Sequence, residues 1–154
     1  MRGIYVIISE LTKPVEIEVR SGRCFTFNDG CYAYVGSALS GLEARINRHL
    51  AKTKKYHWHI DYLLHHALIR SIIYAETEHR EECFIARELA KKLFSVPHFG
   101  CSDCRCSSHL FFAPSQDKLR QRVIEAFTTR NLIPQDYLFN SELPPSKLGG
   151  IKDD

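Results

Sequence analysis

The chain has 154 residues, of which 44% are hydrophobic and 25% charged, and its formal net charge is +3. This length favours a single domain with a buried core, and the composition is that of an ordinary globular protein. The sequence has no run of 18 apolar residues, and its N-terminus lacks the basic and apolar segments of a secretory signal. We therefore expect a cytoplasmic protein with no membrane partner.

The first third of the chain is rich in β-branched and aromatic residues separated by turn signals, which favours strands. The turn sequence Asn28-Asp29-Gly30 is typical of a hairpin, so the segments on either side of it are expected to pair. We expect an antiparallel meander over the first 36 residues. Its strands cover residues 3–11, 15–19, 23–27 and 31–35.

The rest of the chain alternates between helical periodicity and short apolar runs. Leu42, Ile46 and Leu50 repeat every four residues, which predicts an amphipathic helix over 41–52. Ser115, which follows a proline, is typical of a helix N-cap. Further helices are expected over 57–67, 79–94 and 115–128, and further strands over 68–76 and 110–113.

These elements predict an α+β fold, with a small antiparallel β-sheet flanked by helices. We expect a domain over residues 1–114, a C-terminal helix extension over 115–130 and an irregular tail over 131–154. The tail contains three prolines and a pair of glycines and lacks periodicity. We expect its end, from Leu143, to be mobile.

Positive charge is concentrated between Ser40 and Tyr56, where five Lys or Arg residues accompany one acid, Glu43. Part of this charge forms a stripe beside the apolar stripe of the helix over 41–52. Local excess of this kind favours a phosphate-binding patch, although a solvated helix end has the same composition. The candidate nucleic-acid-binding residues are Arg48, Lys52, Lys54 and Lys55.

One acidic residue falls on an apolar stripe. In the helix expected over 79–94, Glu82 lies on the same face as Ala86 and Leu89. A carboxylate on a core-facing stripe is costly unless it is paired or bound to a metal. The alternative is that Glu82 occupies the first helical turn, near the positive end of the helix dipole, and reaches solvent.

Three of the six cysteines crowd into residues 101–106, and a histidine follows them. A Cys-x2-Cys turn suits zinc, but four ligands within nine residues are hard to place around one ion. A zinc site would therefore use three of them and a distant ligand such as His98 or His59. Reduced thiols with a structural or redox role, or an iron–sulfur cluster, are alternatives. The candidate zinc ligands are Cys101, Cys104, Cys106 and His109.

Two tyrosines on expected strands, an arginine on the next helix and Glu82 form a set that suits phosphodiester hydrolysis. That reaction needs a base, a cation that stabilises charge on the phosphate, and a carboxylate that holds a divalent ion. Tyr5 or Tyr34 would need nearby positive charge to act as the base, because the ordinary pKa of tyrosine is about 10. Arg45, Arg48 and His49 could supply that charge. Plain strand aromatics and a surface arginine are the ordinary alternatives.

The order of several short motifs is informative. Gly3-Ile4-Tyr5 precedes Tyr34-Val35-Gly36 and then Arg45, and this order resembles the GIY-YIG nuclease superfamily. The closer resemblance is to a subfamily of unknown function, found alone or fused to an endonuclease III-type glycosylase. It covers Met1 to Pro114. Its further signatures resemble His57-Trp58-His59-Ile60-Asp61-Tyr62, Ser102-Asp103-Cys104-Arg105-Cys106 and His109-Leu110.

The resemblance implies a small antiparallel sheet and single-metal hydrolysis of a DNA backbone with Mg²⁺ or Mn²⁺. By this resemblance Tyr5 is the general base, Tyr34 supports the site and Arg45 contacts the scissile phosphate. His49 matches a histidine of the same helix, and Glu82 matches the metal ligand. The segment between the two tyrosines is longer than in compact members of the superfamily, so it must fit without separating them.

Three hypotheses about function follow. The first is a metal-dependent endonuclease that hydrolyses phosphodiester bonds in branched, damaged or single-stranded DNA, in repair or recombination. The second is a nucleic-acid-binding module without catalysis. The third is a zinc-stabilised interaction domain that recruits a DNA glycosylase as its partner.

Overall fold

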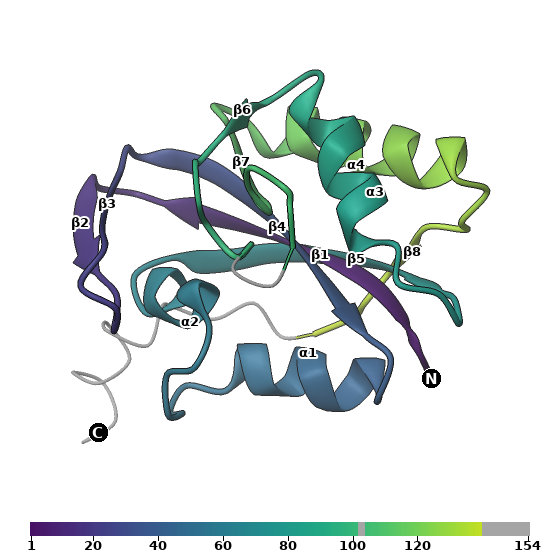
Figure 1. The fold of residues 1–154 in the computed structure, drawn as a ribbon, viewed down its shortest axis with the longest axis horizontal. Coiled ribbons are helices and arrows are strands. Elements are labelled where there is room, and N and C mark those ends of the chain that lie inside the picture. Colours follow the sequence, from purple (N-terminus) through teal and green to yellow (C-terminus); the bar gives the residue numbers. More distant parts are fainter. Residues whose placement is uncertain (102–103, 140–154) are drawn as a thin grey trace.

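The computed structural model describes residues 1–101 and 104–139 as an α+β domain, as the sequence predicts (Figure 1). Its main sheet has six strands in the order β6-β7-β4-β1-β5-β8, and each neighbouring pair is antiparallel. These strands are β1 (Gly3–Leu11), β4 (Gly30–Ala38), β5 (Leu68–Glu76), β6 (Phe94–Ser95), β7 (Leu110–Ala113) and β8 (Gln135–Asp136). A separate two-stranded sheet comprises β2 (Val15–Glu18) and β3 (Cys24–Phe27). The helices are α1 (Leu42–Leu50), α2 (His59–Leu64), α3 (Glu82–Ala90) and α4 (Gln116–Thr129).

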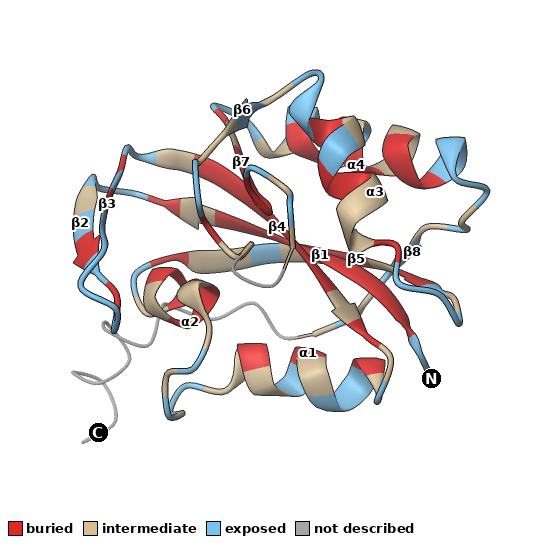
Figure 2. Ribbon diagram, viewed as in Figure 1, coloured by how far each residue is buried: buried red, intermediate tan, exposed pale blue. Residues whose placement is uncertain are grey.

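Helices cover both faces of the main sheet, α3 and α4 on one face and α1 and α2 on the other (Figure 1). Residues of β1 alternate between these faces. Ile4, Val6 and Ile8 enter the core beneath α3 and α4, whereas Tyr5 and Ile7 enter the core on the side of α1 and α2. Figure 2 shows that β1 and β4 are buried along almost their whole length, which explains the apolar run over residues 3–8 of β1.

The predicted meander over the first 36 residues is wrong. β1 pairs directly with β4, while β2 pairs only with β3, in the separate sheet. The apolar side of this small sheet packs into the core on the α1 and α2 face, where Phe27 contacts Tyr32 and Phe99 edge to face. Burial of its aromatic residues on this face therefore keeps β2 and β3 out of the main sheet, and the long insertion leaves β1 and β4 adjacent.

Several elements differ in length from the sequence-based expectation. α1 ends at Leu50, α2 is only six residues long, and α3 runs from Glu82 to Ala90. Strands β6 and β8 were not expected, and each has two residues. The expected strands over 68–76 and 110–113 have the predicted bounds, and Ser115 caps α4 by accepting a hydrogen bond from the amide of Lys118.

The helix expected as an extension packs into the core beneath the sheet. Leu119, Val123 and Phe127 of α4 are fully buried and belong to the same cluster as Ile4 and Val6 of β1. In the described part of the tail, β8 pairs with β5. The expectation of a mobile end from Leu143 lies outside the described residues. Of the helices that the structure describes, none has the length and apolar character that a membrane span requires.

Candidate functional site

A cavity of about 160 Å³ lies beside the second half of β4 and is bordered by α1, the start of α3 and the loop between β6 and β7. On the edge of β4 that pairs with β7, pairing ends at Tyr34. Beyond that point Gly36 and Ser37 border the cavity, while their other edge pairs with β1. The cavity brings together four of the residues that the sequence suggested for phosphodiester hydrolysis. These lining residues are Tyr5, Tyr34, Arg45 and Glu82.

Tyr5 is almost completely buried, with 1% of its surface exposed, and its hydroxyl lies 2.7 Å from Nε2 of His49 on α1. Its ring crosses the neighbouring strand at Gly36, its partner in the β1–β4 register. A Cβ atom at Gly36 would lie 2.4 Å from Cζ and Oη of Tyr5. Glycine at this position is therefore needed for the Tyr5 ring to reach the cavity.

Burial dominates the electrostatics of the Tyr5–His49 pair. It raises the pKa of Tyr5 to about 12, and the positive charge of Arg45 partly opposes this rise. Burial, reinforced by the charge of Lys54, lowers the pKa of His49 to about 3. Burial also raises the pKa of Tyr34 far above its usual range. At neutral pH both tyrosines are therefore protonated and His49 is uncharged.

Arg45 reaches the cavity from α1. Its Nη1 donates to the carbonyl oxygen of Ser37 at 3.1 Å, and its guanidinium lies 4.6 Å from the centre of the Trp58 ring. These contacts fix the side chain on the cavity wall, close enough to Tyr5 for its charge to affect the tyrosine pKa. Arg45 thus places a positive charge beside the Tyr5 hydroxyl.

Glu82 is the first residue of α3 and lies on the stripe that buries Ile85, Ala86 and Leu89. Its side chain is 13% exposed, and Oε1 accepts a bond from Nη1 of Arg80 at 3.3 Å. Oε2 is buried and has no hydrogen-bond partner in the described part of the chain. A buried carboxylate oxygen without a partner is costly, so this atom is suited to binding a cation.

The proposed nucleic-acid-binding residues are in different environments. Arg48 makes a two-pronged ion pair with the fully buried Asp61, with N–O distances of 2.9 and 3.0 Å. Lys54 donates to the carbonyl oxygen of His49 at 2.6 Å. Lys52 and Lys55 are exposed. Arg48 and Lys54 therefore make structural contacts in this protein, and the sequence pattern did not indicate the buried carboxylate of Asp61.

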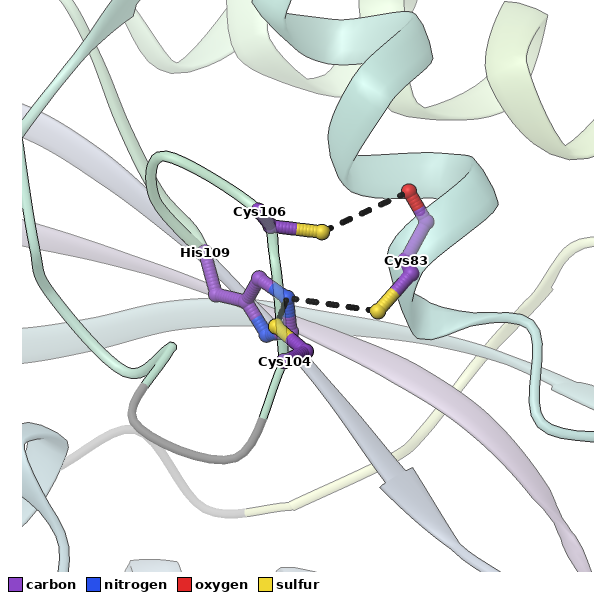
Figure 3. A group of neighbouring side chains, drawn as sticks. All are labelled: Cys83, Cys104, Cys106 and His109. Carbon is purple, nitrogen blue, oxygen red and sulfur yellow. Dashed lines mark hydrogen bonds between the residues drawn. The ribbon is translucent and has the colours of Figure 1, made fainter.

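Four potential metal ligands converge beside the cavity (Figure 3). Their ligand atoms all lie within 4.8 Å of one another. Three come from the loop before β7 and one comes from the first turn of α3 (Figure 3). Burial, with the neighbouring thiols, raises the pKa of one of them, Cys83, to about 12. These residues, the metal-ligand cluster, are Cys83, Cys104, Cys106 and His109.

This set differs from the one expected. Cys101 lies outside the metal-ligand cluster, and its thiol donates to the carbonyl oxygen of Ser107 at 3.7 Å. The distant member of the possible ligand set is Cys83, in place of the suggested His98 or His59. His59 instead accepts a hydrogen bond from the amide of Gly100 at 3.0 Å. No periodicity marks Cys83, because only the packing of α3 against the loop brings it near.

The fold and cavity define an α+β domain that combines a tyrosine-, arginine- and glutamate-lined cavity with a cluster of thiols and an imidazole. The chain belongs to the family described as "Domain of unknown function DUF123", whose model matches residues 4–132. The matched range runs from β1 past the end of α4, so the family unit includes that helix. No curated protein and no solved structure matches the chain.

Proposed function

We propose that this protein is a divalent-metal-dependent nuclease of the GIY-YIG type that hydrolyses phosphodiester bonds in DNA. Its active site would be the cavity around Tyr5, Tyr34, Arg45 and Glu82. One observation carries the proposal. A single cavity gathers a phenol, a guanidinium and a carboxylate from three distant parts of the chain, and one carboxylate oxygen, Oε2 of Glu82, is buried without a partner in the described residues.

Glu82 fits a magnesium or manganese ligand. Mg²⁺ is commonly held by one or two carboxylates and completes its shell with water and substrate phosphate oxygens. Coordination through Oε2 would remove the cost of leaving that atom buried and unpaired. When bound, such an ion supplies a Lewis acid and offsets the negative charge of the phosphate.

Arg45 is suited to bind the phosphate. Its guanidinium has five N–H donors in a rigid fork, and the carbonyl oxygen of Ser37 engages one terminal nitrogen, Nη1. The remaining donors can bind the non-bridging oxygens of a phosphodiester in the cavity. Charge-assisted hydrogen bonds of this kind strengthen as negative charge develops in the transition state.

Tyr5 would orient the attacking water and accept its proton. Because the pKa of Tyr5 is about 12, the phenol needs further positive charge before it can ionise near neutral pH. Arg45 and a cation on Glu82 would supply that charge. Once the Tyr5 phenol has released its proton to solvent, the neutral His49 would donate its Nε2 hydrogen to the phenolate oxygen, a bond for which the 2.7 Å separation is already suitable. The phenolate would then take the proton of the attacking water.

The substrate would approach over the C-terminal end of α1, where Lys52 and Lys55 are exposed. Branched, damaged or single-stranded DNA as the substrate, a role in repair or recombination, and a DNA glycosylase as a partner follow from the resemblance to GIY-YIG nucleases.

Cleavage assays on labelled branched, damaged and single-stranded DNA test the proposal. We expect the wild-type protein to nick at least one of these substrates with Mg²⁺ or Mn²⁺. Tyr5→Phe removes only the hydroxyl, and Glu82→Gln removes only the charge. Each should reduce the cleavage rate at least about 100-fold, because each removes a group that acts in the transition state.

Two matched variants of residues outside the cavity lining serve as controls. Tyr74→Phe alters the residue directly opposite Tyr5 on β5, and Glu76→Gln alters an exposed glutamate at the end of that strand. Both should cleave at the wild-type rate. The proposal fails if the wild-type protein cuts none of the DNA structures in either metal, or if Tyr5→Phe and Glu82→Gln cut as fast as their controls. Salt-sensitive DNA binding without cleavage would favour a binding module instead.

A further inference from the structure

The metal-ligand cluster has a composition and spacing that suit one particular ion. It offers three thiols and one imidazole, the Cys₃His set that zinc takes in closed structural sites. Two thiols converge on the same imidazole nitrogen. Cys104 Sγ lies 3.4 Å and Cys83 Sγ lies 3.9 Å from Nε2 of His109.

A tetrahedral zinc ion explains these distances. Zinc–sulfur bonds of about 2.3 Å and zinc–nitrogen bonds of about 2.0–2.1 Å place neighbouring sulfur and nitrogen ligands about 3.6 Å apart. The two sulfur–nitrogen distances observed lie on either side of this value. All four ligand atoms also lie within 4.8 Å of one another, so small side-chain movements complete the tetrahedron.

Hydrogen bonding alone does not satisfy the cluster. Nε2 of a neutral histidine carries either one hydrogen or one lone pair, so it cannot form a full hydrogen bond with two thiols at once. The thiol of Cys106 makes a long contact, 4.0 Å, with the carbonyl oxygen of Cys83. A metal ion would engage all three sulfurs and the imidazole together.

The backbone holds the ligands in place. The amide of His109 donates to the carbonyl oxygen of Phe99 at 2.8 Å, and the carbonyl oxygen of His109 accepts from the amide of Val35 on β4 at 3.0 Å. Cys83 is fixed by the first turn of α3. The ligands therefore come from two elements that are each anchored independently, and an ion between them would connect these elements.

We propose that Cys83, Cys104, Cys106 and His109 bind one structural zinc ion, which fastens the first turn of α3 to the loop before β7. All four positions of the ion are taken by protein side chains, so it has no open position for a substrate. This inference is independent of the proposed nuclease activity.

The zinc ion also shapes the cavity. Cys83 directly follows Glu82, and the cavity wall includes both Cys104 and His109. The same loop packs on Tyr34, since a Cβ atom at Gly100 would lie 3.0 Å from Cε1 of that tyrosine. Joining α3 to this loop therefore fixes the position of Glu82 relative to Tyr34.

Elemental analysis of the full chain, purified in metal-free buffer, tests the site directly. We expect one zinc ion per wild-type chain. Cys83→Ser and Cys106→Ser should each lower zinc occupancy at least about tenfold after dialysis against a weak chelator. Cys101→Ser is the matched control, because this thiol lies in the same loop but outside the cluster, and it should retain its zinc.

Two measurements on the wild-type protein keep the test decisive if the cysteine variants fail to fold. Replacement of zinc by Co²⁺ should give the strong visible bands of a tetrahedral thiolate site. Removal of zinc by a strong chelator should lower the Tm by at least about 5 °C, and zinc should restore it whereas magnesium should not.

Several outcomes would overturn the inference. One is a wild-type chain that contains no zinc and takes no Co²⁺ into a thiolate site. Another is equal loss of zinc from Cys101→Ser and Cys83→Ser. Stoichiometric iron in place of zinc, or a disulfide between cluster cysteines in the freshly purified protein, would also contradict it.

Discussion

At the scale of single residues, Tyr5 and His49 form a buried hydrogen-bonded pair whose protonation is controlled by burial. His49 is 2% exposed, and Nδ1 of its ring has no hydrogen-bond partner in the described part of the chain. A charged imidazole would therefore be poorly stabilised, which agrees with its pKa of about 3. Protonation of His49 therefore disfavours the folded state relative to the unfolded state.

The low pKa of His49 predicts that the free energy of unfolding decreases as the pH falls below about 7. The unfolded chain binds a proton on His49 near its ordinary pKa of 6.5, whereas the folded chain does so only near 3. Between these values the unfolded state binds more protons, so stability rises with pH. Lowering the pH from about 7 to about 5 should cost about 2 kcal/mol of unfolding free energy through His49 alone.

Urea unfolding at a series of pH values measures this contribution. His49→Gln cannot titrate, so its stability should change less over the same range. The histidines His59, His66 and His109, whose pKa values burial also lowers, are present in both proteins and cancel in the comparison. Parallel pH profiles for the wild-type protein and His49→Gln would show that His49 does not contribute in this way.

At the scale of elements, one ion pair joins α1 to α2. Asp61 is fully buried and accepts two bonds from Arg48 and two from the amides of His57 and Trp58 at the start of α2. The guanidinium of Arg48 also lies 4.4 Å from the centre of the Trp58 ring. The two hydrogen bonds between Arg48 and Asp61, together with the contact of Arg48 with the Trp58 ring, therefore hold α1 against the start of α2.

Arg48→Ala should therefore lower the unfolding free energy by about 3 kcal/mol, because it leaves the buried carboxylate of Asp61 without its cation. Arg48→Lys should fall between the wild-type protein and the alanine variant, since a lysine keeps the charge but loses the planar fork. Chemical unfolding monitored by circular dichroism measures the difference. Lys55→Ala removes an exposed positive charge nearby and should change stability by less than about 0.5 kcal/mol. A wild-type stability for Arg48→Ala would mean that Asp61 needs no cation.

At the scale of the whole molecule, the main sheet separates two hydrophobic cores, and each core is closed from solvent by its own pair of helices. The core beneath α3 and α4 contains Phe127, which is completely buried beside strand residues of β1 and β4. Without α4, the apolar face formed by Ile4, Val6 and Ile8 would lose most of its cover on that side. The C-terminal helix is therefore required for the stability of the domain.

Phe127→Ala should cost about 3–5 kcal/mol, the usual range for removing a buried phenylalanine. Thermal and urea unfolding of the full chain measures this loss. Leu138→Ala removes a large side chain that is 89% exposed and should leave stability within about 0.5 kcal/mol of the wild-type value. If both variants lost equal stability, α4 would not be part of the core.

The sequence by itself determined the features that depend on local pattern. Alternation and apolar runs placed β5 and β7 at their observed bounds, and the proline and serine before α4 marked its start. Helical periodicity placed Glu82 on a largely buried stripe. The resemblance to a nuclease superfamily also predicted that Tyr5, Tyr34, Arg45 and Glu82 share one site, although it could not give the distances between them.

Only the tertiary structure decided the features that depend on which distant segments meet. Hydrophobic packing turned β2 and β3 into a separate sheet, so Tyr5 and Tyr34 stay on neighbouring strands despite the long insertion. Packing of α3 against the loop before β7 brought Cys83, rather than Cys101, to the metal-ligand cluster. The buried Asp61 engaged Arg48, which the charge pattern alone had assigned to DNA. Periodicity describes the neighbours of a residue along the chain, whereas strand pairing, ion pairing and metal ligation are set by neighbours in space.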